Sequence, residues 1–275
     1  MSGLTTLVHV KSILEPLIAT KQSASVALLF RRYLGTLTHV QVWYDGEVWN
    51  EQDPAFKSVQ KVRKMHKTVA ARLNADAQVT GASGPLKLSQ YDMLITQFAF
   101  IGFVILMPAK FGILWTAYDL ECVVHFWRLI GNLLGIEDEY NLCSRSVTEV
   151  QDMCAVILQH EMRTAFSEGG KRGTTSSQMS RGILESIRPY VPLIRWDAYL
   201  KYLATLLDSE EKTMKLNMKG NLIYHSMTLT LQILVKNVFF GRTMNYLLRR
   251  AIRKAHRKRA KIAQRLEKKY ADYIL

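Results

Sequence analysis

A run of 17 residues without a charged side chain, residues 93–109, constrains the fold of this chain more than any other feature. The run is shorter than the roughly 20 apolar residues that a membrane-spanning helix needs. It contains Thr96 and Gln97 and has Pro108 near its end. We therefore predict a buried core helix that stops before Pro108, because the proline ring disfavours helix in the residue before it. The alternative is a segment that lies in a membrane or a lipid monolayer.

Helix-start signals surround this run, and no stretch alternates apolar and polar residues between hairpin turns as strands do. Ser89 and Asp92 have the spacing of a capping box, in which each side chain bonds the other residue's backbone amide. Thr116 and Asp119 repeat the pattern and open a helix that we expect to end at Gly135, a natural C-terminal cap. These signals predict an all-α fold.

Two further helices are predicted before the central run, one over residues 25–38 and a basic one from Pro54 to about residue 74. Residues 80–85 (TGASGP) break the chain between this basic helix and the central run. Residues 167–182 are rich in Gly, Ser and Thr and form the most loop-like stretch, which we predict to be a surface loop within a single domain.

The charge of the chain is concentrated in its last 27 residues. Residues 249–275 hold 11 Lys or Arg and 2 Asp or Glu, a net +9 of the +14 carried by the whole chain. We therefore expect a domain over residues 1–248 and a basic helical tail over 249–275. Helical spacing aligns a thin apolar stripe along this tail: Ile252, Ala255, Ile262, Leu266 and Tyr270.

Such a basic helix has two interpretations. It docks on an anionic membrane face, or it is a solvated charged helix packed on the domain. We do not expect nucleic acid as a partner, because the basic run has few aromatic side chains on which bases would stack.

Cysteine usage and the first residues bear on the cellular setting. Cys122, Cys143 and Cys154 are odd in number and form no Cys-x-x-Cys pair, which argues against a disulfide framework and against a thiolate zinc site. The first 18 residues lack the charged and then apolar order of a signal peptide. We expect an intracellular, reducing environment.

Several familiar active sites are absent from the sequence. It has no glycine-rich phosphate loop, no Gly-x-Ser-x-Gly elbow and no His-Glu-x-x-His motif. It also lacks the paired Glu-x-x-His motifs of a four-helix di-iron site. Glu121 and His125 are four residues apart and share a helix face, which is weak evidence for a metal site.

A histidine lies within an apolar stripe of the basic helix. Val59, Val62, Val69 and Leu73 fall on one helix face, and His66 falls between them. One interpretation is a core histidine that bonds a carbonyl group. The other is an axial haem ligand, since haem iron is commonly held by one neutral imidazole in an apolar pocket.

The cations beside His66 are consistent with the second interpretation. Haem has two propionates, which favour Arg or Lys at the pocket edge, and Arg63 and Lys67 flank the stripe.

Four sequence blocks together resemble the catalytic domain shared by the rubber oxygenases and the ER-bound oxygenase MpaB. The first two are KVRKMHKTVAARL, which contains His66, and LSQYDMLITQFAFIGF some twenty residues later. The third is HFWRLIGNLLGIEDEYNLC over residues 125–143. The fourth, RYLGT, matches the upstream Arg-x-x-Lys-Thr block of the family at Arg32 and Thr36, with Gly35 in place of the lysine. The resemblance covers residues 12–143 well and the remainder loosely.

The resemblance implies an all-α, globin-like core that binds haem b with His66 as the iron ligand. It implies O2 activation and oxidative cleavage of a carbon–carbon double bond in an apolar isoprenoid or lipid-like substrate. Arg32 and Thr36 are then expected to face the haem pocket, and His125 is expected to pack beside it. Glu15 is near the place of the family's proposed catalytic base, but the match there is poor.

The functional prediction is therefore a haem-dependent oxygenase in the cytoplasm or peripherally associated with the ER membrane. The alternative is an inactive or haem-free relative that acts as a scaffold at a membrane surface.

Overall fold

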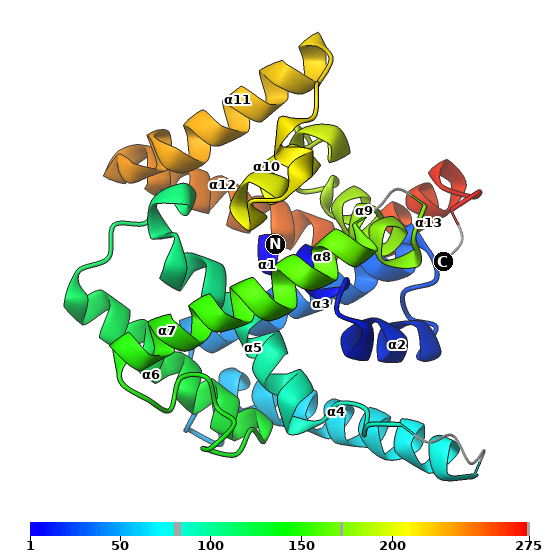
Figure 1. Cartoon of the computed structure of the whole chain (residues 1–275), viewed down its shortest axis with the longest axis vertical. Coiled ribbons are helices and arrows are strands. Elements are labelled where there is room, and N and C mark those ends of the chain that lie inside the picture. The colour runs from blue at the N-terminus through cyan, green and yellow to red at the C-terminus, as the bar shows by residue number, and fades with distance from the viewer. Residues whose placement is uncertain (80–83, 171–172, 274–275) are drawn as a thin grey trace.

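The computed structural model describes residues 1–79, 84–170 and 173–273, and helices make up its architecture (Figure 1). The α-helices are α1 (Ser2–Leu7), α2 (Lys11–Ala19), α3 (Val26–Asp45), α4 (Pro54–Val79), α5 (Gln90–Leu106), α6 (Ala117–Leu134), α7 (Val147–Ile157), α8 (Arg163–Gly169), α9 (Thr175–Ile187), α10 (Trp196–Leu207), α11 (Met218–Gln232), α12 (Val238–Arg257) and α13 (Arg259–Lys269). Short helical turns are η1 (Pro108–Phe111), η2 (Leu158–Met162), η3 (Glu210–Thr213) and η4 (Leu234–Lys236). No strand occurs within these ranges, so the all-α prediction is confirmed.

Helix α5 is the central core helix that the uncharged run predicts. Ile95 and Phe98 are completely buried, and α1 packs along α5 so closely that a Cβ atom added to Gly3 would lie 1.8 Å from the carbonyl oxygen of Ala99. A backbone approach this close requires glycine. In the part of the chain that is described, no helix is both long enough and apolar enough to cross a membrane.

Local capping chemistry sets the ends of α5 and α6 as predicted. The Ser89 hydroxyl accepts from the amide of Asp92 at 3.2 Å, and the Asp92 carboxylate accepts from the amide of Ser89 at 2.9 Å. Thr116 and Asp119 form the same reciprocal pair, and Gly135 ends α6 with φ of 99°. Helix α5 ends at Leu106, just before Pro108.

Two observed helices extend beyond their predicted ends. Helix α3 begins after Ser25 as predicted but continues to Asp45, and α4 continues to Val79, beyond the predicted end at residue 74. The α3 extension packs on α4 through the buried Trp43, and this packing overrides the weak local signals. In the α4 extension Ala75, Asp76 and Gln78 are exposed, so this end of the helix continues without such cover. Residues 80–83 of the predicted break at 80–85 lie outside the described residues.

The prediction of a surface loop over 167–182 is wrong. Helix α8 runs to Gly169 and α9 begins at Thr175, and only a short connection lies between them. Ser180 and Gly182 are buried where α9 packs against α3, and a Cβ atom at Gly182 would lie 2.7 Å from the Leu29 side chain. The small residues that resemble a loop in the sequence permit this close helix packing.

The basic tail packs on the domain. Its predicted start at 249 falls inside α12, and Ile252, Ala255 and Leu266 of the apolar stripe are buried. Helix α13 packs against α3, and the Arg249 guanidinium donates to both carboxylate oxygens of Asp45 at 2.8 and 3.1 Å. The tail stripe is therefore occupied by contacts within the domain.

The three cysteines are free, and Cys122 is the exposed one. Burial raises the pKa of the Cys154 thiol to about 12 and raises that of Cys143 as well, so both are protonated at neutral pH.

Candidate functional site

The register of α3 against α4 brings Arg32 near enough to His66 for its charge to act on the imidazole. The Ser58 hydroxyl on α4 bonds His39 Nδ1 at 2.7 Å and accepts from Trp43 Nε1 at 3.0 Å, both on α3. Because the two helices run antiparallel, moving seven to eight residues back along α3 corresponds to moving the same distance forward along α4. That step leads from His39 to Arg32 and from Ser58 to His66.

The His66 ring is in the state that a metal ligand needs. Its Nδ1 atom is buried without a hydrogen-bond partner among the described residues. Burial, followed by the nearby charge of Arg32, lowers the pKa of His66 from 6.5 to about 4. The imidazole is therefore neutral at physiological pH and keeps a lone pair for coordination.

Arg32 is a half-buried cation without an anion among the described residues. Burial lowers the pKa of its guanidinium, and no ion pair or side-chain hydrogen bond holds that group within the described ranges. A charge withdrawn from water is normally paired, so this position favours an anionic ligand. One turn later, the Thr36 hydroxyl donates to the Arg32 carbonyl at 3.2 Å, which leaves the lone pairs of its oxygen available.

Open space adjoins these two side chains at Gly35. A Cβ atom added there would meet no atom within 4 Å. Gly35 stands where the family pattern has a lysine, and no neighbouring group in the described structure fills the space of that lysine side chain.

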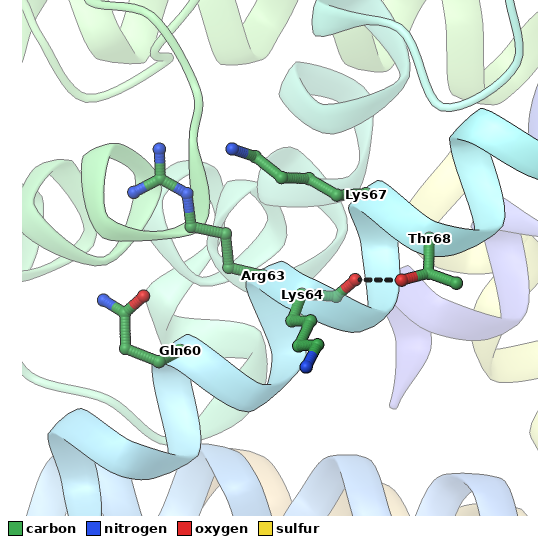
Figure 2. A pocket seen from close by; sticks show the side chains of 5 residues that line it. All are labelled: Gln60, Arg63, Lys64, Lys67 and Thr68. Carbon is green, nitrogen blue, oxygen red and sulfur yellow. Dashed lines mark hydrogen bonds between the residues drawn. The ribbon is translucent and has the colours of Figure 1, made fainter.

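Arg63 and Lys67 lie beside His66 on α4, on the flank that faces α6. They line a hollow of about 310 Å³, which we call the α4 hollow, and Figure 2 shows both side chains extending to the same side of the helix. The residues that line it are Gln60, Arg63, Lys64, Lys67 and Thr68. At about 100° per residue, Arg63 lies about 60° and Lys67 about 100° around the helix from His66.

Arg63 already has a structural partner. Its Nη1 donates to the carbonyl oxygen of Leu133 at 3.4 Å, near the C-terminus of α6, where a cation meets the negative end of the helix dipole. Lys67 is exposed. The structure thus brings His66 and Arg32 together and directs Arg63 to α6.

His125 is exposed on α6 and lacks the burial that distinguishes His66. No group of three or more His, Cys, Asp or Glu side chains suited to a metal ion occurs among the described residues.

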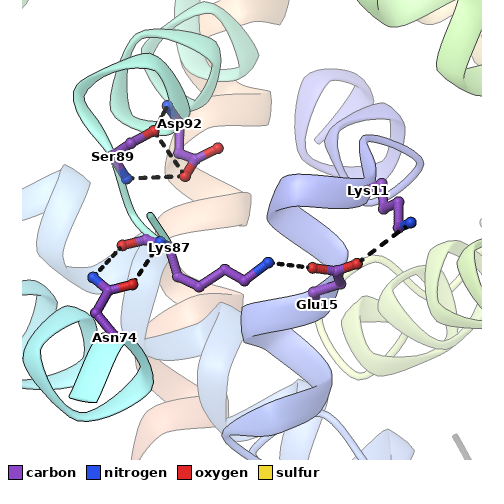
Figure 3. Close-up of polar contacts among 6 residues, drawn as sticks. All are labelled: Lys11, Glu15, Asn74, Lys87, Ser89 and Asp92. Atoms are coloured by element: carbon purple, nitrogen blue, oxygen red, sulfur yellow. Dashed lines mark hydrogen bonds and ion pairs between the residues drawn. The ribbon is translucent and has the colours of Figure 1, made fainter. Parts of the chain in front are cut away.

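Glu15 forms an ion pair with Lys87, which lies in the segment just before α5 (Figure 3). Lys87 Nζ lies 2.5 Å from one carboxylate oxygen of Glu15, and Lys11 Nζ lies 3.9 Å from the other. The Asn74 side chain fixes the Lys87 backbone by accepting from its amide at 2.8 Å and donating to its carbonyl at 3.2 Å. This contact joins α2, α4 and the start of α5.

Other motif residues build the scaffold around the helices. The Gln97 side-chain amide donates to Asn141 Oδ1 at 3.0 Å and to the Trp127 carbonyl at 2.8 Å. A Cβ atom at Gly131 would lie 2.7 Å from Asn141 Nδ2, so this network requires glycine there. Gln90 donates to the carbonyl of Gly135 at 3.1 Å.

His9 is a buried histidine that sequence reasoning missed. Both of its ring nitrogens are buried, and its ring lies edge-on to Phe166 with centroids 5.1 Å apart. Burial lowers its pKa from 6.5 to about 4, and the nearby backbone of Gly169 opposes this shift only in part. The only signal in the sequence is its position between Val8 and Val10.

Acid is expected to destabilise the free protein through His9 and His66. The unfolded chain binds protons on both residues below about pH 6.5, whereas the folded chain does so only near pH 4, so stability falls as the pH drops through this window. Each histidine contributes a loss of about 2 kcal/mol between pH 6.5 and about pH 5. Urea unfolding of wild type and His66→Gln at both pH values measures it. The fall in unfolding free energy between the two pH values should be smaller for His66→Gln than for wild type and unchanged for His125→Gln. An equal fall in all three proteins would contradict the prediction for His66.

Comparison with known proteins gives one family. The family model described as "ER-bound oxygenase mpaB/B'/Rubber oxygenase, catalytic domain" matches residues 2–206. The match covers more than half of the chain and ends within α10, so α11, α12 and α13 lie beyond it. Searches of curated proteins and of solved structures found no match.

Proposed function

We propose that this chain, which belongs to the catalytic-domain family of the ER-bound oxygenase mpaB and the rubber oxygenases, is a haem b-dependent oxygenase. The family supports oxygenase chemistry with O2 and a small-molecule substrate. Our proposal adds the haem and an apolar, isoprenoid or lipid-like substrate whose carbon–carbon double bond is cleaved. The observation that carries it is the position of the unpaired cation Arg32 near the neutral, unpartnered imidazole of His66.

The residues present fit the requirements of haem b. One neutral histidine with an unsatisfied ring nitrogen suits the iron, and no further protein ligand is required. When bound, the haem would supply O2 activation, which amino-acid side chains do not provide. Lys67 is exposed and able to meet a propionate, whereas Arg63 is engaged with Leu133 and holds α4 against α6.

Helices α4 and α3 contribute different groups to the proposed site. His66 on α4 is the ligand, and Arg32 and Thr36 on α3 supply polarity near it. The half-buried guanidinium of Arg32 stabilises negative charge that develops near it, because a preorganised cation that is partly withdrawn from water acts more strongly than a fully solvated one. The Thr36 oxygen, whose proton is given to the Arg32 carbonyl, is able to accept a hydrogen bond.

The absorption spectrum of the purified protein tests this proposal. Protein produced with haem available should show a Soret band, and the free protein titrated with ferric haem should saturate at one equivalent. Oxygen uptake with a polyisoprenoid substrate then tests the reaction itself. If haem produces no spectral change and does not co-purify, the proposal is wrong and the haem-free scaffold interpretation replaces it.

A further inference from the structure

Exposed apolar side chains gather on one helical hairpin that lies beyond the family match. We define the hairpin as residues 218–248, which comprise α11, η4 and the first half of α12. Of the 22 large hydrophobic side chains that are exposed among the described residues, ten lie in this segment. They are Met218, Leu222, Leu229, Ile233, Val238, Phe239, Met244, Tyr246, Leu247 and Leu248. A concentration of this kind marks an interaction surface.

One face of α11 is covered and the opposite face is open. The inner face packs on α10 and on η1, where a Cβ atom added to Gly112 would lie 2.2 Å from the carbonyl oxygen of Leu231. Met218, Leu222, Leu229 and Ile233 form a helical stripe on the open side, and a hollow of about 440 Å³ lies beside it. In Figure 1, α11 runs along the outer edge of the molecule.

The first turns of α12 are exposed in the same way. Val238 is 61% exposed and Phe239 is 80% exposed, although both are strongly apolar. The helix becomes covered only further on, where Ile252 and Ala255 enter the core. The hairpin therefore presents apolar side chains from both of its helices.

The charge that the hairpin segment itself carries has a single sign, and the acidic neighbours Asp45 and Asp197 are already paired with Arg249 and Arg195. Residues 214–257 contain nine Lys or Arg and no Asp or Glu. A second copy of the chain would bring two such cationic surfaces together without an anion between them. An anionic lipid surface matches both features, because it offers phosphate to the cations and an apolar boundary to the exposed side chains.

We propose that the hairpin docks the chain on an anionic membrane surface, with Leu222 and Phe239 entering the boundary between headgroups and acyl chains. The cations of α12 meet the lipid phosphates. The tail stripe is buried against α3, so the tail supplies charge and the hairpin supplies the apolar contact. Neither helix crosses the bilayer in this arrangement. The proposal does not depend on haem binding.

Vesicle co-sedimentation tests the hairpin. The full chain is mixed with phosphatidylcholine vesicles that contain about one third phosphatidylserine, and with vesicles of phosphatidylcholine alone. Leu222→Ser and Phe239→Ser are compared with Leu86→Ser, a matched control on a distant segment, since Leu86 is 66% exposed and Leu222 is 68% exposed. All three positions are on the surface, and circular dichroism verifies that each variant folds.

We expect wild type and Leu86→Ser to bind anionic vesicles, with binding that weakens as salt rises. Each hairpin variant should bind at least fivefold more weakly. Equal binding by the hairpin variants, or no binding of wild type to anionic vesicles at low salt, would overturn the proposal. Sedimentation velocity without lipid gives a further test. A dimer of wild type that Leu222→Ser dissociates would assign this surface to a second copy of the chain.

Discussion

His66→Ala is expected to abolish stable haem binding while the helical circular dichroism is retained. His66 supplies a neutral, half-buried imidazole near Arg32, and alanine would leave the iron without its protein ligand. Haem titration followed in the Soret region measures the loss, and we expect the affinity to fall by at least 100-fold. The substitution also shortens a side chain on α4 without removing one of the buried valines, so the fold should persist.

His125→Ala is the matched control, because it removes an exposed histidine from the neighbouring helix α6. This variant should keep the wild-type Soret band. A wild-type band in His66→Ala would show that the ligand assignment is wrong, and loss of the band in His125→Ala would then make His125 the ligand.

Arg32→Ala is expected to retain haem and to lose oxygen consumption by about 100-fold, the scale on which removing one preorganised charge slows a reaction. Oxygen uptake with a polyisoprenoid substrate measures this effect. A second readout follows from the charge itself. Because Arg32 lowers the pKa of His66, its removal raises that pKa, and acid-induced haem release should move to a higher pH.

The neighbouring Arg31 provides the control for this variant. It is exposed and lies 3.9 Å from Glu267, so Arg31→Ala should leave both oxygen uptake and the pH of haem release unchanged. Complete haem loss in Arg32→Ala would instead identify Arg32 as a partner of the propionates, and unchanged turnover would remove it from the reaction.

The features that were predicted correctly from the sequence depend on residues close together along the chain. The two capping boxes and the stop at Pro108 each involve three or four consecutive positions, and the structure confirms them. The placement of His66 on an apolar face follows from the periodicity of its own helix. Helix α9 was missed because its Ser and Gly residues serve helix packing, a purpose that only the contact with α3 reveals.

The site itself depends on contacts that local patterns do not contain. Arg32 was singled out only through the family resemblance, and its position near His66 follows from the bonds that Ser58 makes to His39 and Trp43. The roles of Arg63 and Gln97 emerge likewise from partners tens of residues away. His9 has no periodic pattern around it, so its burial was not predictable.

The packing of α13 on α3 has a consequence for synthesis of the chain. More than 200 residues separate these helices, and the hydrogen bond between Thr5 and Tyr199, at 2.6 Å, spans 194. Contacts of such long sequence separation form slowly. A ribosome that adds about 5–20 residues per second needs roughly 10–40 seconds to travel from α3 to α13. During that interval α4 and α9 are able to pack on α3, but the part of its surface that α13 covers stays exposed, and we expect the nascent chain to depend on chaperones until α13 emerges.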